Sequence, residues 1–161
     1  MWLNFDATGI FRLAQPLQPD STQRGICKHI TRGLRMRILV VDDNKGFLNV
    51  MGDLLSDSGY EVFLAEDGKQ AREFLEEERV DLIISDVFMP TLDGSRFHSY
   101  VREFTDAGNV PFIFISGFDD EHTRKVVVDS SIDFFVSKTA PVETIVSLIE
   151  NIRMSLQLKT A

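Results

Sequence analysis

Cysteine, long apolar runs and net positive charge are all scarce in this sequence of 161 residues. The single cysteine, Cys27, excludes an internal disulfide and fits a reducing compartment. No apolar run reaches the length of a membrane-spanning helix, and the N-terminus lacks the basic and apolar regions of a secretory signal. The formal net charge of −8 argues against nucleic acid, whose phosphates attract lysine and arginine. These absences predict a cytoplasmic protein that binds neither membrane nor nucleic acid directly.

The first 35 residues differ from the rest. They carry five basic and two acidic residues, a net charge of +3, which leaves −11 for the remainder. Their apolar residues follow no clear period, and a second methionine, Met36, stands directly before the first clear strand pattern. Two interpretations of residues 1–35 stay open. They form either a dispensable upstream extension or an arm that docks on the domain or a partner through apolar side chains: Trp2, Leu3, Phe5, Ile10, Phe11 and Leu13.

From residue 37 onward, short apolar runs alternate with helical patterns. Buried strands are predicted at 38–41, 60–64, 82–86, 110–115 and 132–136. Four of the five helices that follow these strands have an expected apolar face; the fourth helix is the exception. The apolar residues of the first, second, third and last helix, in that order, are Phe47, Val50, Met51, Leu54 and Leu55; Ala71, Phe74 and Leu75; Phe97, Tyr100, Val101 and Phe104; and Val142, Ile145, Val146, Ile149 and Ile152. Five such units predict an α/β fold, a doubly wound parallel sheet with helices on both faces.

Local signals set several helix boundaries. Asn44 is a plausible helix cap, Gly59 ends the first helix and Asp67 with Gly68 leads the second. Pro141 suits the first turn of the last helix. The fourth helix, over 119–129, is expected to be the least secure, because its three consecutive valines lose side-chain freedom in a helix.

Polar groups fall at the carboxyl ends of four predicted strands. They are Asp42 with Asp43, then Asp86, Ser116 and Lys138. In a doubly wound sheet these ends meet at one edge. Three carboxylates crowded there repel one another, and a hydrated Mg²⁺ ion suits such an oxygen-only site. Each residue alone would suit a turn, a cap or the surface; together they predict a phosphoryl-transfer site with Asp86 as the nucleophile.

The region from Met36 to Leu158 resembles the response-regulator receiver domain of two-component signalling, in its stand-alone, chemotaxis-regulator-like form. The matching residues are the pair Asp42 and Asp43, Asp86 with Met89-Pro90 and Asp93-Gly94, Ser116-Gly117, and Phe135 three residues before Lys138. The resemblance implies one receiver domain at 36–158 after an extension at 1–35. It also implies a flavodoxin-like sheet with strand order 2-1-3-4-5.

The resemblance further assigns the phosphoryl chemistry. Asp86 would accept a phosphoryl group from a sensor histidine kinase or a phosphotransfer protein. Asp43 would bind Mg²⁺ directly, Asp42 through water, and the backbone carbonyl of Phe88 would complete the protein ligands. The protein would then be a switch and not an enzyme.

The resemblance also implies which residues would transmit the phosphorylation signal to a partner. Ser116 and Lys138 would contact the phosphoryl group, and Phe135 would turn inward as Ser116 moves. The fourth helix, fifth strand and last helix would form the output surface for a downstream target protein.

The sequence departs from the family pattern after the lysine. Most receivers have Lys-Pro with a cis bond, whereas here Lys138 is followed by Thr139, Ala140 and Pro141. A cis bond after Lys138 is not expected, because non-proline cis bonds cost about 2.5–4 kcal/mol.

Two aromatic residues border the path of an attacking water. Phe88 and Phe118 each stand two residues beyond a site residue, Asp86 or Ser116. Our hypothesis is that they exclude water and give a long-lived phosphoaspartate. The alternative is that they face a partner and leave the hydrolysis rate unchanged.

Other interpretations stay open. A haloacid-dehalogenase-type phosphohydrolase would need Asp-x-Asp after its first strand, where this chain has Asp42-Asp43-Asn44. A degenerate receiver would be a constitutive binding module, and the chain could be one piece of a longer protein. His29, His98 and His122 show no metal-binding spacing and are expected at the surface or half-buried. Cys27 is expected to be an inert thiol.

Overall fold

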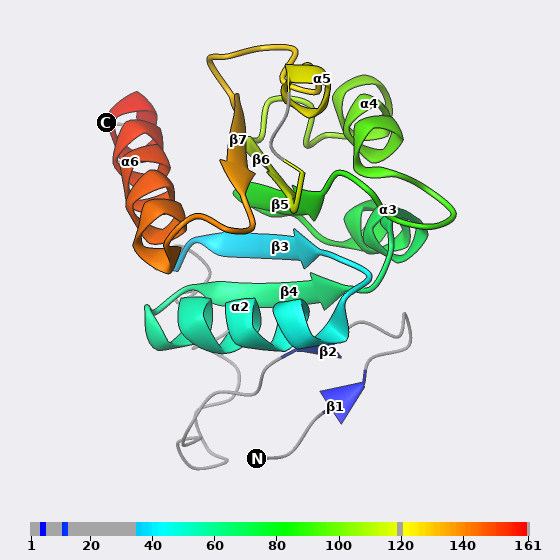
Figure 1. Cartoon of the computed structure of the whole chain (residues 1–161). Helices are drawn as coiled ribbons and strands as arrows, with labels where there is room; N and C mark the ends of the chain where they lie inside the picture. Colours follow the sequence, from blue (N-terminus) through cyan, green and yellow to red (C-terminus); the bar gives the residue numbers. More distant parts are fainter. Residues whose placement is uncertain (1–3, 6–10, 13–34, 119–120, 161) are drawn as a thin grey trace.

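The computed structural model describes residues 4–5, 11–12, 35–118 and 121–160. Its centre is a parallel sheet of five strands: β3 (Arg37–Val41), β4 (Glu61–Ala65), β5 (Leu82–Asp86), β6 (Phe112–Ser116) and β7 (Asp133–Ser137). Their spatial order is β4-β3-β5-β6-β7, so the predicted order 2-1-3-4-5 is confirmed (Figure 1). The strand boundaries fall within two residues of the predicted ones.

Two short strands extend this sheet beyond β4. β1 (Asn4–Phe5) pairs antiparallel with β2 (Phe11–Arg12), and β2 pairs antiparallel with β4, placing Phe11 opposite Leu64. Part of the N-terminal segment therefore lies along the outer edge of the sheet. The other candidate docking residues, Trp2, Leu3, Ile10 and Leu13, lie outside the described residues, as do Cys27 and His29.

Helices cover both faces of the sheet. They are α2 (Lys45–Asp57), α3 (Gly68–Glu77), α4 (Gly94–Phe104), α5 (Glu121–Arg124) and α6 (Val142–Thr160). Alternate side chains of each strand point to opposite faces, so Ile38 and Val40 pack with α2 and α6, whereas Leu39 and Val41 pack with α3 and α4. In the described part of the chain, no helix combines the length and apolar character that a membrane crossing requires.

Side-chain caps begin three of these helices. Asn44, Asp67 and Asp93 each accept a hydrogen bond from the backbone N–H three residues ahead, at 3.1, 2.8 and 2.9 Å. These bonds satisfy N–H groups that have no partner within the helix. Gly59 follows α2 with φ of +91°, which glycine adopts without strain. The predicted Asn44 cap, Asp67-Gly68 start and Gly59 stop are confirmed.

Several predicted burial assignments are wrong. Val50, Phe104 and Val142 are 60%, 71% and 40% exposed, because α2 turns Leu48 toward the sheet in place of Val50 and the other two stand at helix ends. His98, predicted to be at the surface or half-buried, is only 4% exposed and lies on the buried face of α4. The predicted helix over 119–129 is the least regular, as expected, since α5 spans one turn and excludes Val126–Val128.

Candidate functional site

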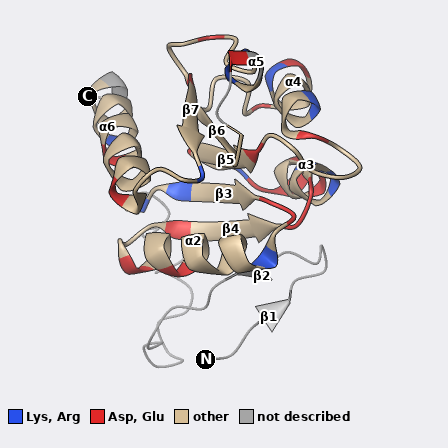
Figure 2. Ribbon diagram, viewed as in Figure 1, with Lys and Arg blue, Asp and Glu red and all other residues tan. Residues whose placement is uncertain are grey.

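The predicted acidic residues meet at the carboxyl ends of β3 and β5. Asp42 and Asp43 follow β3 directly, and Asp86 is the last residue of β5. One carboxylate oxygen from each lies within 4.8 Å of the others. Figure 2 shows acidic residues, in red, on the segment that leaves β3 and at the tip of β5. Asp42 and Asp86 are buried and Asp43 is exposed, so the cluster is open to solvent on one side.

Lys138 reaches this cluster from the end of β7. Its Nζ donates to Asp86 Oδ2 at 2.8 Å and forms an ion pair with Asp42 Oδ2 at 2.6 Å. Its backbone N–H donates to the carbonyl of Ser116 at 2.7 Å, which fixes the start of the loop. Burial acts to lower the pKa of Lys138, but hydrogen bonds with Asp42 and Asp86 outweigh it and raise the pKa. Lys138 is therefore a fixed positive charge beside both carboxylates.

The carboxylate of Asp42 can bind a further cation besides Lys138. Its Oδ1 accepts the N–H of Asn44 at 2.8 Å, whereas Oδ2 is buried and has only the ion pair with Lys138, with no well-directed hydrogen bond. Burial raises the pKa of Asp42, against the lowering effects of Lys138 and Asn44. Buried carboxylate oxygen, two neighbouring carboxylates and one open side fit a hard divalent cation such as Mg²⁺.

Ser116 lies beside Asp86 on the neighbouring strand. Asp86 is in register with Ile115, and the N–H of Val87 donates to the Ile115 carbonyl at 3.0 Å. The buried Ser116 hydroxyl accepts the N–H of Phe118 at 3.0 Å, so it is engaged by its own loop. Phe135 lies on the next strand, opposite Phe114, and is half-buried.

The loop after Asp86 is tightly constrained. The N–H of Phe88 donates to Asp86 Oδ1 at 3.3 Å; the role of the Phe88 carbonyl as a metal ligand stays a prediction. Gly94 donates its N–H to the Val87 carbonyl at 2.9 Å, and a Cβ at Gly94 would lie 2.1 Å from the Asp86 carbonyl oxygen. Thr91 has φ of +70°, an uncommon conformation for a β-branched residue. The Asp93-Gly94 pair therefore serves to close the loop.

One contact of the site was missed by the sequence reasoning. The ring centroid of Phe47 lies 4.9 Å from Lys138 Nζ, so the ring contacts the ammonium group through its face. The sequence assigned Phe47 to the apolar face of α2. No local pattern distinguishes the two roles, because Lys138 is distant in the chain.

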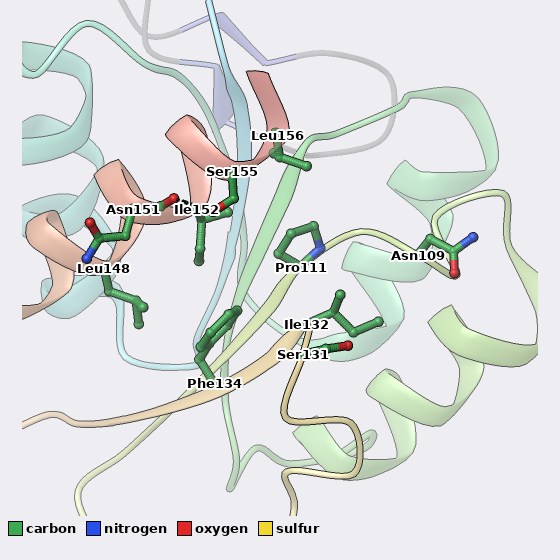
Figure 3. Close-up of a pocket in the computed structure, with 10 residues that line it drawn as sticks. All are labelled: Asn109, Pro111, Ser131, Ile132, Phe134, Leu148, Asn151, Ile152, Ser155 and Leu156. Atoms are coloured by element: carbon green, nitrogen blue, oxygen red, sulfur yellow. Dashed lines mark hydrogen bonds between the residues drawn. The ribbon is translucent and has the colours of Figure 1, made fainter. Parts of the chain in front are cut away.

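An apolar groove lies elsewhere in the described structure. It has a volume of about 150 Å³ and runs between α6 and the amino ends of β6 and β7 (Figure 3). Its apolar lining is Pro111, Ile132, Phe134, Leu148, Ile152 and Leu156. None of its lining side chains is charged, and it lies at the opposite ends of the strands from Ser116 and Lys138. The acidic cluster is therefore the better site for charged-group chemistry.

Comparisons with known proteins identify the family over the region that contains this cluster. A profile of the response regulator receiver domain matches residues 38–150. The CAI-1 autoinducer sensor kinase/phosphatase CqsS of Vibrio cholerae is 33% identical over 105 residues, 65% of this chain and 15% of that protein. The response regulator MprA of Mycolicibacterium vanbaalenii is 31% identical over 112 residues, 70% of this chain and 48% of that protein. The chain thus spans less than half the length of either protein.

A solved structure shows the same arrangement of strands and helices. The chemotaxis protein CheY4 of Vibrio cholerae, crystallised at low pH, matches with a TM-score of 0.68 and 26% sequence identity. The match covers 73% of this chain and 98% of CheY4.

Proposed function

The chain belongs to the response regulator receiver family of two-component signalling, and from this membership we propose that it is a phosphorylation switch. Receiver domains interact with histidine kinases or phosphotransfer proteins. Here Asp86 would take the phosphoryl group from a phosphohistidine on such a partner. The observation that supports this role most directly is the contact of Lys138 Nζ with both Asp86 and Asp42.

The proposed reaction needs few groups from the protein. A carboxylate oxygen of Asp86 attacks phosphorus while the P–N bond of the phosphohistidine breaks, and the bond electrons return to the imidazole nitrogen, which takes up a proton from solvent. Lys138 neutralises charge on the transferred oxygens. Mg²⁺, held by Asp42, Asp43, Asp86 and the Phe88 carbonyl, would supply further positive charge there.

We further propose how the signal leaves the site. The Ser116 hydroxyl would exchange the N–H of Phe118 for a phosphoryl oxygen, and Phe135 would turn inward as Ser116 moves. The output surface would comprise α5, β7 and α6, where a downstream protein in the cytoplasm would bind. Val128, which follows α5 and is 80% exposed, lies in this region.

Intact mass spectrometry after incubation with Mg²⁺ and acetyl phosphate tests this proposal. The wild type should gain one phosphoryl group, and Asp86→Asn should gain none. Absence of the gain in the wild type would favour a constitutive binding module. We also propose that the chain is not an enzyme, so neither protein should turn over p-nitrophenyl phosphate; sustained turnover would support a phosphohydrolase.

A further inference from the structure

A second cluster of ionisable side chains lies away from Asp86, at the amino end of β7. Asp133, the first residue of β7, is 2% exposed, and its Oδ1 accepts from His98 Nε2 at 2.9 Å and Arg102 Nη2 at 2.5 Å. The His98 ring centroid lies 4.9 and 5.1 Å from those of Phe112 and Phe114. This cluster therefore connects α4 to β7 beneath the surface of the domain.

The other oxygen of Asp133 holds the segment after α5. Asp133 Oδ2 accepts the backbone N–H groups of Val128 and Asp129, at 3.3 and 2.9 Å. Burial acts to raise the pKa of Asp133, but bonds from Arg102, the Asp129 N–H and His98 outweigh burial and keep the pKa below its ordinary value. The carboxylate is therefore ionised, and donors occupy both of its oxygens.

These two N–H groups are the donors that a longer α5 would need. In a continuous α-helix, Val128 and Asp129 would donate to the carbonyls of residues 124 and 125. An N–H that already donates to Asp133 cannot make a good helical bond as well. In the structure, Val126 and Val127 donate to carbonyls only three residues back, at 3.3 Å, and regular helix ends at Arg124. The contact with Asp133 and the extension of α5 therefore exclude each other.

The same segment packs on the core cluster that receives Phe135, the proposed switch aromatic. Val126 and Val127 pack on the core cluster that also receives Phe135, while Val128 is exposed. At the other end, the Phe118 N–H is held by the Ser116 hydroxyl. A movement of Ser116 toward a phosphoryl group would release Phe118, three residues before α5 begins. Both ends of the segment from Phe118 to Asp129 are therefore held by residues that a change at Asp86 can reach through β6 or β7.

We propose that Asp133, positioned by His98 and Arg102, is a clamp that holds α5 at one turn, and that phosphorylation of Asp86 is coupled to release of this clamp and extension of α5 through Asp129. The coupling rests on the proposed function; the clamp itself does not. Because coupling between two sites is reciprocal, weakening the clamp tightens binding of a phosphoryl mimic at Asp86. Asp133 is a positioning residue and takes no part in the chemistry.

Two variants favour the longer α5 by different routes, one by removing an acceptor of the clamp and the other by raising helix propensity. Asp133→Asn keeps the shape of the side chain but replaces one acceptor oxygen with an amide nitrogen, so it cannot accept from both sides. Val128→Ala removes an exposed side chain with little packing to lose and raises helix propensity. Tyr60→Phe is the matched control. It removes a hydrogen bond to Glu150 of α6, on the opposite face of the sheet.

Two measurements decide the proposal. The first is backbone chemical shift and amide hydrogen exchange at residues 126–129, without ligand. The backbone chemical shifts of these residues should move toward helical values in Asp133→Asn and Val128→Ala and not in Tyr60→Phe. The second is the affinity for beryllofluoride with Mg²⁺, which should tighten about five-fold in Asp133→Asn and about two-fold in Val128→Ala.

The outcomes separate the clamp from the proposed function. Unchanged shifts at residues 126–129 in Val128→Ala would overturn the clamp, even if Asp133→Asn failed to fold. Helix extension with equal beryllofluoride affinity in all variants would overturn the coupling. Failure of the wild type to bind beryllofluoride at all would count against the proposed function, and the shift data would still decide whether Asp133 limits α5.

Discussion

The rings of Phe88 and Phe118 meet edge to face, with their centroids 5.6 Å apart. Each is the second residue beyond a proposed site residue, Asp86 or Ser116, so the contact joins the loops that follow β5 and β6. Both rings remain more than half exposed, at 52% and 66%. The pair therefore forms one aromatic group on the solvent side of the loops that carry the proposed chemistry.

Opening this pair should shorten the life of the phosphoaspartate. In Phe88→Asn the ring contact is lost and a polar side chain admits water beside Asp86, so we expect the phosphoryl half-life to fall by about ten-fold, equivalent to about 1.4 kcal/mol in the barrier. Decay of the phosphorylated mass over time measures it. Phe104→Asn, which changes an exposed aromatic residue of α4, is the control. An unchanged or longer half-life in Phe88→Asn would favour a partner-facing role for the pair.

Replacing Asp43 with asparagine should distinguish the repulsion among the three carboxylates from their binding of Mg²⁺. Without Mg²⁺, Asp43→Asn relieves crowding among three carboxylates, so we expect Tm to rise by about 2–4 °C. Added Mg²⁺ should stabilise the wild type by binding the folded state, and this gain should largely disappear in Asp43→Asn. Thermal unfolding with Mg²⁺ and with EDTA measures both effects. Asp53→Asn, exposed on α2, should behave as wild type; a full Mg²⁺ gain in Asp43→Asn would exclude Asp43 as a ligand.

Gly94→Ala should destabilise the loop that supports Asp86. The added methyl group would lie 2.1 Å from the Asp86 carbonyl oxygen and 3.0 Å from Val87 Cα, both backbone atoms that cannot turn aside. We expect the free energy of unfolding to fall by about 3 kcal/mol, measured by urea denaturation. At Gly46 the nearest atom to an added methyl is Asn44 Oδ1, 3.2 Å away, in a side chain that can adjust. Equal stability losses in Gly94→Ala and Gly46→Ala would show that the close approach at Gly94 is unimportant.

Ionisation of Tyr60 at alkaline pH should reduce the stability that its contact with α6 contributes. Burial and the hydrogen bond to Glu150 raise the pKa of Tyr60 to about 12. Because the folded-state pKa is raised, this contribution is complete below about pH 10 and is lost as pH rises to about 12, at most about 2–3 kcal/mol. Absorbance titration of tyrosinate should show a component near pH 12 that Tyr60→Phe removes and Tyr100→Phe keeps. Its survival in Tyr60→Phe would contradict the assignment.

Much of the fold could be predicted because the relevant signals are local. Apolar runs of strand length, the Asn44 and Asp67 caps and the turn at Gly59 all act within a few residues. The sequence also placed polar groups at four strand ends. Parallel pairing then brought Asp42, Asp43, Asp86 and Lys138 into one cluster, as expected.

The misassigned residues depended on contacts between distant parts of the chain. His98 has no partner near it in sequence, and only the packing of α4 on β6 and β7 brings Asp133 within 2.9 Å. Phe104 follows the apolar period of α4 but stands at its last residue and stacks on Tyr100, with centroids 5.9 Å apart. Periodicity shows which residues share a helix face and does not show where the sheet beneath that face ends.

The sequence by itself determined the order of strands and helices along the chain, the polar residues at the carboxyl ends of four strands and the acidic net charge of the domain. These properties depend only on residue type and spacing. Tertiary structure decided which groups hold one another: Lys138 with Asp42 and Asp86, Phe88 with Phe118, and Asp133 with His98, Arg102 and the segment after α5. The length of α5 shows the difference most clearly. Its sequence allows a longer helix, but a carboxylate on the next strand takes the N–H groups that the next turn would need.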